Sequence, residues 1–156
     1  MSDLHTFLTS FQSTVLGTLA HNGYPFNSYA PFYYDGEVVY IFISDISTHA
    51  KNIRHIPKAS AFFIEDESIT PNIFRRKRIS LQCDVKRIEK DEKMFQPIME
   101  NFQAKFEQGT LSMLMRMKDF NLYALKPIGG EATFGFGEAY DIGGEKMNQL
   151  IKKSSD

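Results

Sequence analysis

The sequence predicts a mainly β fold, a six- to seven-stranded antiparallel barrel with a few helices, and three observations support this expectation. First, the turn signals Asn22-Gly23 and Asp35-Gly36 separate three segments rich in β-branched and aromatic residues, as in a meander of strands joined by two-residue turns. Second, apolar and polar residues alternate from Ile79 to Val85, which is typical of a strand with one buried face. Third, strands and helices show no βαβ alternation, and closing a barrel removes the edges of an antiparallel sheet.

The strands are expected to form a single domain that spans residues 1–156. A short helix at 3–12 precedes the barrel, which should occupy residues 14–140, and an amphipathic tail at 144–153 follows it. The expected strands lie at 14–20, 26–34, 38–43, 59–64, 79–85, 120–125 and 132–140.

Helical periodicity appears at three places inside the barrel sequence. A short helix is expected at 47–53, and one further helical turn at 111–115. The longest helix should begin at Asp91 and end at Gly109, because the apolar residues between them fall on one stripe. Pro127 should stop the strand that begins at Phe120, since proline cannot donate to a sheet ladder.

Composition excludes several classes of protein and site. The formal net charge of −1 creates no field that would favour nucleic acid or an anionic membrane. Cys83 is the only cysteine, so neither an internal disulfide nor a metal site built on paired cysteines is expected, and the thiol should be a small buried hydrophobe. The sequence has no signal-peptide pattern and no apolar run near the roughly 20 residues of a membrane span, so the cytoplasm is the expected location.

The sequence contains no nucleophile elbow, Walker loop, zincin motif or dinucleotide fingerprint, so any chemistry should come from a bound cofactor. A basic run at 75–78 is the first candidate binding feature. It is either a solvated loop balanced by the acidic run at 65–67 or an anion cradle, since arginine suits carboxylate and phosphate groups. Arg78 is the best candidate for the cradle because it lies one residue before a strand with a buried face, and Arg76 accompanies it.

The segment 44–53 is the second candidate feature. Ser47 and Thr48 stand at a helix start, where they either cap free N–H groups or help those groups to hold an anion. His49 follows them and has the chemistry to donate to an anion or to ligate a metal, and Lys51 belongs to the same segment. Two further features remain open: the glycines at 134–140 permit either close approach of a ligand or tight packing, and Asp119 starts a strand as a turn or site residue.

Taken in order and spacing, six short segments resemble the HugZ/HutZ haem-utilisation branch of the pyridoxamine-phosphate-oxidase-like split barrels. The segments are 28–32, 43–44 with 49–53, 64–67, 76–81, 119–122 and 135–140. The resemblance covers nearly the whole chain and implies a split-barrel homodimer with ligand sites at the subunit interface. Studied members of the family bind haem, and some degrade it to release iron.

The resemblance also implies roles for individual residues. Arg78 would meet a haem propionate or another anion, Asp119 from the neighbouring subunit would orient the ligand site, and His49 would line it. The family's proximal haem ligand is a histidine in the C-terminal tail, and residues 145–156 of this sequence contain no histidine, which favours haem binding over turnover.

The sequence leaves two other functions open. The wider superfamily contains FMN-binding oxidoreductases, in which a Ser-x-Lys pattern helps to hold the FMN phosphate. Ser47-Thr48-His49 occupies that place here, and neutral histidine is a weaker phosphate partner than lysine. The third candidate is a non-enzymatic dimer that binds a ligand without catalysis.

Overall fold

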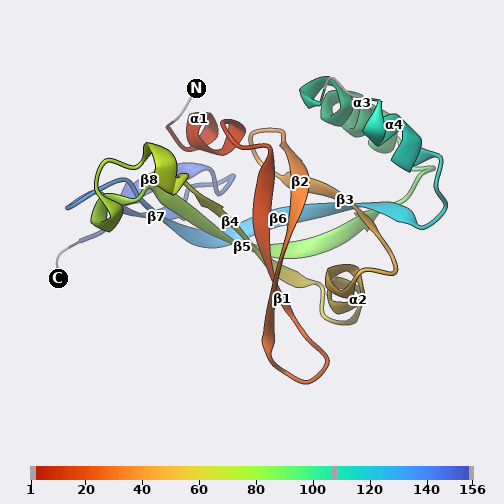
Figure 1. Cartoon of the computed structure of the whole chain (residues 1–156), viewed down its shortest axis with the longest axis horizontal. Helices are drawn as coiled ribbons and strands as arrows, with labels where there is room; N and C mark the ends of the chain where they lie inside the picture. Colours follow the sequence, from red (N-terminus) through yellow and green to blue (C-terminus); the bar gives the residue numbers. More distant parts are fainter. Residues whose placement is uncertain (1–2, 107–108, 155–156) are drawn as a thin grey trace.

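The computed structural model describes residues 3–106 and 109–154 of the chain. Six antiparallel strands form a closed barrel in the order β3-β2-β1-β4-β5-β6, and the pairing of β3 with β6 completes the closure (Figure 1). The strands are β1 (Ser13–Leu19), β2 (Pro25–Tyr34), β3 (Val39–Ser44), β4 (Lys58–Ile64), β5 (Arg78–Ile88) and β6 (Phe120–Thr133). The antiparallel barrel that the sequence predicts is therefore confirmed.

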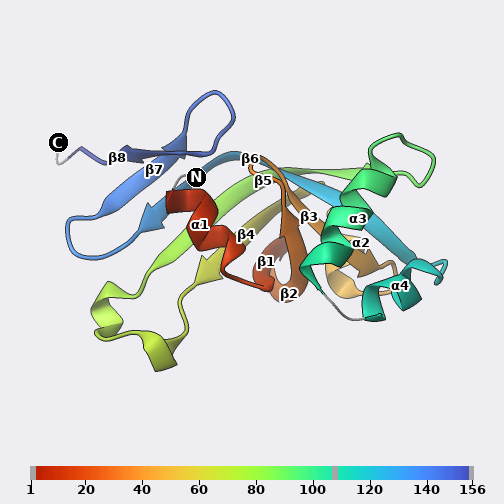
Figure 2. The same cartoon turned by 90° about the horizontal axis from the view of Figure 1, so that it is seen from above.

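Two additional strands extend the sheet beyond the barrel. β7 (Ala139–Gly143) pairs with the end of β6, and β8 (Gln149–Lys152) pairs with β7. Figure 2 shows this extension at the side of the molecule opposite α3 (Phe95–Lys105) and α4 (Thr110–Met115). The expected amphipathic tail thus contributes a strand, in which Leu150 packs against the barrel core while its neighbours face outward.

Two short helices complete the barrel core. α1 (Asp3–Thr9) inserts Leu4 and Leu8, and α2 (Thr48–His55) inserts Ala50 and Ile53. Two 3-10 turns, η1 (Glu67–Ile69) and η2 (Ile73–Arg75), lie between β4 and β5. Among the residues 3–106 and 109–154, no helix combines the length and the apolar character needed to cross a membrane.

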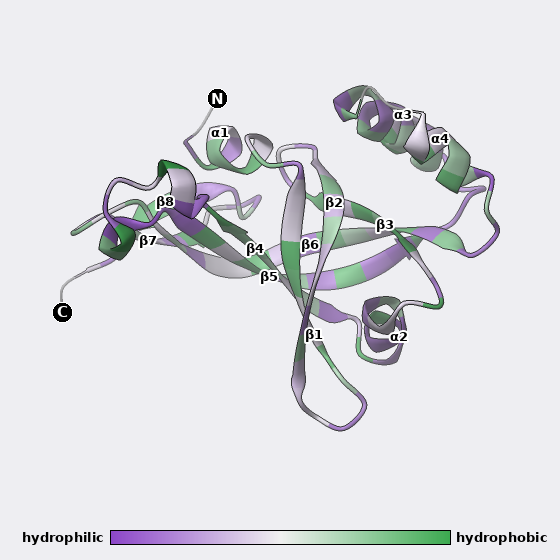
Figure 3. Ribbon diagram, in the orientation of Figure 1, coloured by the Kyte–Doolittle hydropathy of each residue, from purple (hydrophilic) through white to green (hydrophobic). Residues whose placement is uncertain are grey.

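β6 separates two apolar clusters because its side chains alternate between the two faces of the sheet. Tyr123 and Leu125 belong to the barrel core, whereas Leu122 faces a second cluster that includes Met99 and Phe102 of α3. Side chains also alternate along β5, where buried apolar residues are followed by more exposed polar ones. Figure 3 shows this pattern as successive green and purple bands along the strand. The long strand β6 is therefore buried on both faces over much of its first half.

The prediction that Pro127 stops the sixth strand is wrong. β6 continues through Pro127 to Thr133, because the register with β5 shifts between Gln82 and Cys83. Cys83 pairs with Pro127 and Gln82 with Gly129, so Ile128 is the extra residue of a bulge. A bulge is one of the few places where a sheet accepts proline, since a ladder hydrogen bond is already interrupted there.

The expected strand at 132–140 is also wrong, because the chain turns within it. The Phe134 N–H donates to the Glu138 carbonyl at 2.9 Å, which closes a turn between β6 and β7. Gly137 adopts φ 73°, a left-handed conformation that favours glycine. The glycine-rich segment is thus a connection between two strands.

The longest helix begins later than the sequence predicts. Residues 90–94 form turns, and α3 begins at Phe95 instead of Asp91. The Glu89 N–H donates to the Glu92 carboxylate at 2.5 Å, so local side-chain bonding competes with helix formation there. α3 ends at Lys105, and part of the expected helix, residues 107–108, lies outside the described residues. The two hairpin connections are also longer than two residues, at 20–24 and 35–38.

Candidate functional site

The predicted site residues fall into two groups at opposite ends of β6. Arg78 pairs with Thr133, which is the last residue of β6. Arg76 lies two residues before Arg78 in the sequence. Asp119 immediately precedes Phe120, the first residue of the same strand. At about 3.3 Å per residue, the 14 residues of β6 place roughly 40 Å of strand between Arg78 and Asp119. One copy of the barrel therefore does not bring the two groups together.

In the first group, Arg76 and Arg78 have different partners. Arg76 Nε donates to the Glu65 carbonyl at 2.5 Å, and its Nη1 lies 3.4 Å from the Glu67 carboxylate. Arg78 is half-buried and its Nη1 donates to the Arg76 carbonyl at 2.8 Å, but its guanidinium makes no other hydrogen bond with the described residues. Arg76 is thus occupied by the acidic run, while Arg78 keeps donors for an anion.

The turn between β6 and β7 lies against the basic run. The Arg75 guanidinium lies 4.8 Å from the centroid of the Phe136 ring, and Phe136 is 64% exposed. Phe74, the neighbour of Arg75, is 80% exposed. Exposed aromatic rings beside arginines provide a surface suited to a flat, anionic ligand. The sequence singles out both segments but does not indicate that they meet.

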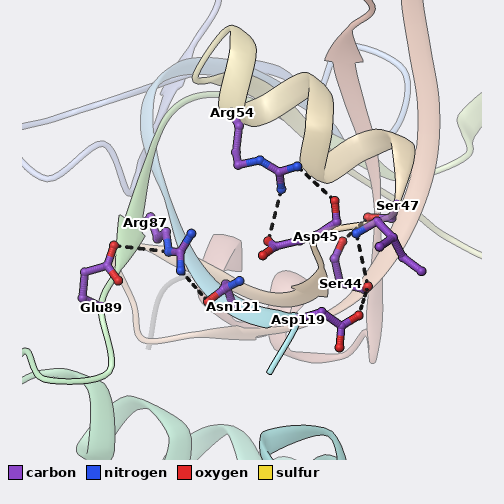
Figure 4. Close-up of polar contacts among 9 residues, drawn as sticks. Ser44, Asp45, Ser47, Arg54, Arg87, Glu89, Asp119 and Asn121 are labelled. Atoms are coloured by element: carbon purple, nitrogen blue, oxygen red, sulfur yellow. Dashed lines mark hydrogen bonds and ion pairs between the residues drawn. The ribbon is translucent and has the colours of Figure 1, made fainter. Parts of the chain in front are cut away.

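In the second group, Asp119 is anchored to the end of β3 (Figure 4). The Ser44 hydroxyl donates to Asp119 Oδ2 at 2.6 Å, and the Asp45 N–H donates to the Asp119 carbonyl at 2.7 Å. The second carboxylate oxygen, Oδ1, has no hydrogen bond with the described residues. Asp119 therefore acts as a connection residue between β3 and β6 and still offers one acceptor.

The start of α2 lacks the side-chain cap that is one of the two sequence-based interpretations. Ser47 occupies the N-cap position, but its side chain makes no cap hydrogen bond and donates to the Ser44 carbonyl at 2.6 Å instead. Thr48 and Lys51 are exposed. The first turn of α2 thus has a hydroxyl beside it, and the Arg54 guanidinium at the other end of the helix reaches back to Asp45 in the preceding loop.

His49 belongs to α2, and its side chain contacts β2. Its Nδ1 lies 2.7 Å from the Ser28 hydroxyl, and the ring is half-buried. Burial lowers the pKa of His49 below its usual value, so the imidazole is neutral at pH 7. A neutral imidazole is a poor partner for a phosphate and a good ligand for a metal. Sequence reasoning missed Ser28 as a site residue, since it contacts His49 only through the tertiary fold.

The other histidines form different contacts. His21 and His55, from the β1–β2 hairpin and the end of α2, stack with ring centroids 4.2 Å apart and an 18° interplanar angle. The sequence indicates no such pair, because the two residues are far apart along the chain. Among the described residues, no group of three or more His, Cys, Asp or Glu side chains is arranged to hold a metal ion. Burial raises the pKa of Cys83 to about 12, which confirms its expected role as a buried, inert side chain.

An open groove of about 470 Å³ lies on the outer face of the barrel, between the ends of β6. Its lining includes Gly17 of β1, Ser60 of β4, Gln82 of β5 and Ile128 of the β6 bulge. Ile128 is 54% exposed, and Val15 and Leu19 of β1 also present apolar surface outward. This groove, called the β1–β4 groove below, separates the Arg78 group from the Asp119 group.

Comparisons with known proteins agree with the fold and the sequence motifs. A family model for pyridoxamine 5'-phosphate oxidase matches residues 2–133. The chain is 30% identical over 149 residues to the haem oxygenase HutZ of Vibrio cholerae serotype O1, covering 96% of this chain and 84% of HutZ.

Solved structures give the same result. Campylobacter jejuni ChuZ has a TM-score of 0.86 and 33% identity over 97% of this chain, which spans only 61% of the ChuZ chain. HutZ, described as a haem storage protein from Vibrio cholerae, has a TM-score of 0.74 and 29% identity over 80% of this chain and 87% of its own. The chain belongs to the pyridoxamine 5'-phosphate oxidase family, in the branch of HutZ-like haem-utilisation proteins.

Proposed function

We propose that this protein is a homodimeric, cytoplasmic haem-binding protein of the haem-utilisation type. The proposal rests on two side chains: His49, which is anchored by Ser28 and has a neutral imidazole, and Arg78, whose guanidinium keeps free donors. A haem site needs an iron ligand and cations for the propionates, and these two residues have that chemistry. The names of the relatives HutZ and ChuZ, from the same branch, support haem as the ligand.

The separation of the two groups supports a homodimer. In a twofold dimer, residue i of one copy meets residue j of the other, and the reverse contact occurs as well. A twofold axis passing through the β1–β4 groove would set Arg78 of one copy against Asp119 and His49 of the second copy. The exposed apolar residues Val15, Leu19 and Ile128 would then be covered by the second copy.

In this arrangement the residues of the chain have distinct roles. Arg78 would bind a propionate through its free guanidinium donors, with Arg76 holding the backbone of the loop. Asp119 would accept a hydrogen bond through Oδ1, and His49 would face the iron. Thr48, Ser47 and Lys51 would line the polar edge of the cleft. Bound haem supplies an iron centre able to react with oxygen, which is the chemistry used in haem degradation.

The structure gives less support to FMN as the cofactor. The place where related flavin enzymes hold a phosphate contains Ser47, Thr48 and His49, and the histidine is neutral. The cations of α2 near that turn are the exposed Lys51 and Arg54, and the Arg54 guanidinium is engaged by the Asp45 carboxylate and carbonyl. A dianionic phosphate would lack the charge-assisted contacts that make such sites strong.

Titration of the purified protein with hemin tests the proposal. We expect a saturable Soret band at one haem per chain, a dimer by light scattering, and weaker binding after Arg78→Ala but not after Lys77→Ala, the matched exposed neighbour. In the same experiment, FMN should show little fluorescence quenching. A ligand at 100 times its Kd adds roughly 2.7 kcal/mol of stability, so a thermal shift with hemin and none with FMN is a second readout.

Three results would contradict the proposal. A monomer in solution would remove the composite site. Saturable binding of FMN without binding of hemin would favour the oxidoreductase. A dimer whose melting temperature neither ligand changes would leave a non-enzymatic module with another ligand.

A further inference from the structure

The contact between Ser28 and His49 joins two elements that are distant in sequence. Ser28 lies in β2 on the same face as Ala30 and Phe32, whose side chains are buried in the barrel core, and it pairs across the sheet with the buried Leu16. His49 is the second residue of α2. The 2.7 Å contact between Ser28 Oγ and His49 Nδ1 therefore fixes the imidazole ring against the rigid wall of the barrel.

His49 also differs from the other three histidines in its surroundings. His21 and His55 are exposed and stack on each other. His5 belongs to α1 and lies beside Tyr34, with ring centroids 5.5 Å apart. His49 lies two residues after Ser47, whose hydroxyl donates to the Ser44 carbonyl, and the Ser44 hydroxyl in turn donates to Asp119.

The hydrogen bond to Ser28 leaves one ring nitrogen of His49 for a ligand. Nδ1 is engaged by the hydroxyl, and Nε2 makes no hydrogen bond with the described residues. A neutral imidazole that binds a metal through Nε2 must carry its proton on Nδ1, and that proton needs an acceptor. The Ser28 hydroxyl oxygen can accept a hydrogen bond from this N–H.

We infer that His49 is the haem-iron ligand of this chain, through Nε2, and that Ser28 is the positioning residue that fixes its tautomer and ring orientation. This inference rests on the proposed haem-binding function. The Ser28 hydroxyl oxygen accepts a hydrogen bond from Nδ1–H, which leaves the Nε2 lone pair for the iron and keeps the ring from rotating. Loss of such a supporting contact typically weakens metal binding by about 10- to 100-fold.

The test combines hemin titration with resonance Raman spectra of the ferrous complex, in which an iron–histidine stretching band reports the ligand directly. We expect His49→Ala to lose the band and to regain a histidine-like spectrum when free imidazole is added. Ser28→Ala should shift the band and weaken hemin binding by about 10-fold or more, whereas Ser28→Thr, which keeps the hydroxyl, should restore both. His55→Ala, at the exposed end of the same helix, is the matched control and should match the wild type.

The outcomes separate the inference from the proposed function. If the wild type binds hemin and His49→Ala keeps the iron–histidine band, another residue is the ligand and the inference is wrong, although the protein still binds haem. If Ser28→Ala lowers only the melting temperature and leaves the band unchanged, Ser28 is merely structural. If the wild type does not bind hemin at all, the proposed function itself fails.

Discussion

Arg78 and Asp119 stand at opposite ends of β6, with the β1–β4 groove between them. Each keeps hydrogen-bonding capacity that its own barrel does not use: guanidinium donors on Arg78 and the Oδ1 acceptor on Asp119. In the homodimer proposed above, a ligand that contacts both residues would lie between two copies of the chain.

Complementation between two inactive chains tests the shared site. Arg78→Ala and Asp119→Ala should each weaken hemin binding, because every site in either homodimer lacks one residue. A heterodimer of the two variants has one intact site and one doubly altered site, so it should bind one haem at wild-type affinity. Differently tagged chains allow the heterodimer to be isolated for titration. Equal weakness of the heterodimer and both homodimers would show that no site combines Arg78 of one chain with Asp119 of the other.

Tyr123 should be replaceable by phenylalanine without loss of stability. Its hydroxyl is buried and has no hydrogen-bond partner among the described residues, and its ring is 2% exposed in the barrel core. Removing an unsatisfied buried hydroxyl should leave the free energy of unfolding unchanged or raise it by up to about 1 kcal/mol. Urea denaturation measures this, with Tyr123→Ala as a control that should cost about 3–5 kcal/mol by opening a cavity. A clear loss in Tyr123→Phe would reveal a partner for the hydroxyl.

Lys105 should make the fold more stable as the pH rises from 8 to 10. Burial lowers the pKa of Lys105 to about 8, while the amine lies 3.5 Å from the Phe32 ring centroid and donates to the Phe32 carbonyl at 2.8 Å. The unfolded chain keeps the proton up to about pH 10.4, so above pH 8 it binds more protons than the folded chain and stability rises. Lys105→Met should flatten this rise in denaturation curves recorded at each pH, and the same slope in both proteins would show that other groups cause it.

Gly17 and Ser60 should be energetically coupled. They are cross-strand partners in β1 and β4, and a Cβ on residue 17 would collide with the Ser60 hydroxyl. Gly17→Ala should therefore cost about 0.5–1.5 kcal/mol of stability, because the Ser60 hydroxyl must turn away from its rotamer. Adding Ser60→Ala removes the colliding oxygen and should recover most of that loss, because the remaining Ser60 Cβ lies at an ordinary contact distance of 3.7 Å. Additive effects in this double-mutant cycle would contradict the collision.

Much of the fold could be predicted because its signals are local. Alternation along 79–85 identifies β5, and turns occur at the predicted Asn-Gly and Asp-Gly positions, where Gly23 and Gly36 adopt φ values of 86° and 101°. Such features depend on residues a few positions apart, so periodicity and turn chemistry are sufficient to find them. The order of the HutZ-like motifs likewise identifies the family without coordinates.

The sequence by itself determined the antiparallel barrel, the family and the residue types of the candidate site. Only the tertiary structure decided that β6 passes Pro127 through a bulge, that Ser28 holds His49, and that Arg78 and Asp119 lie at opposite ends of one strand. The physical reason is that these features depend on register and on contacts between distant segments, which no local pattern encodes.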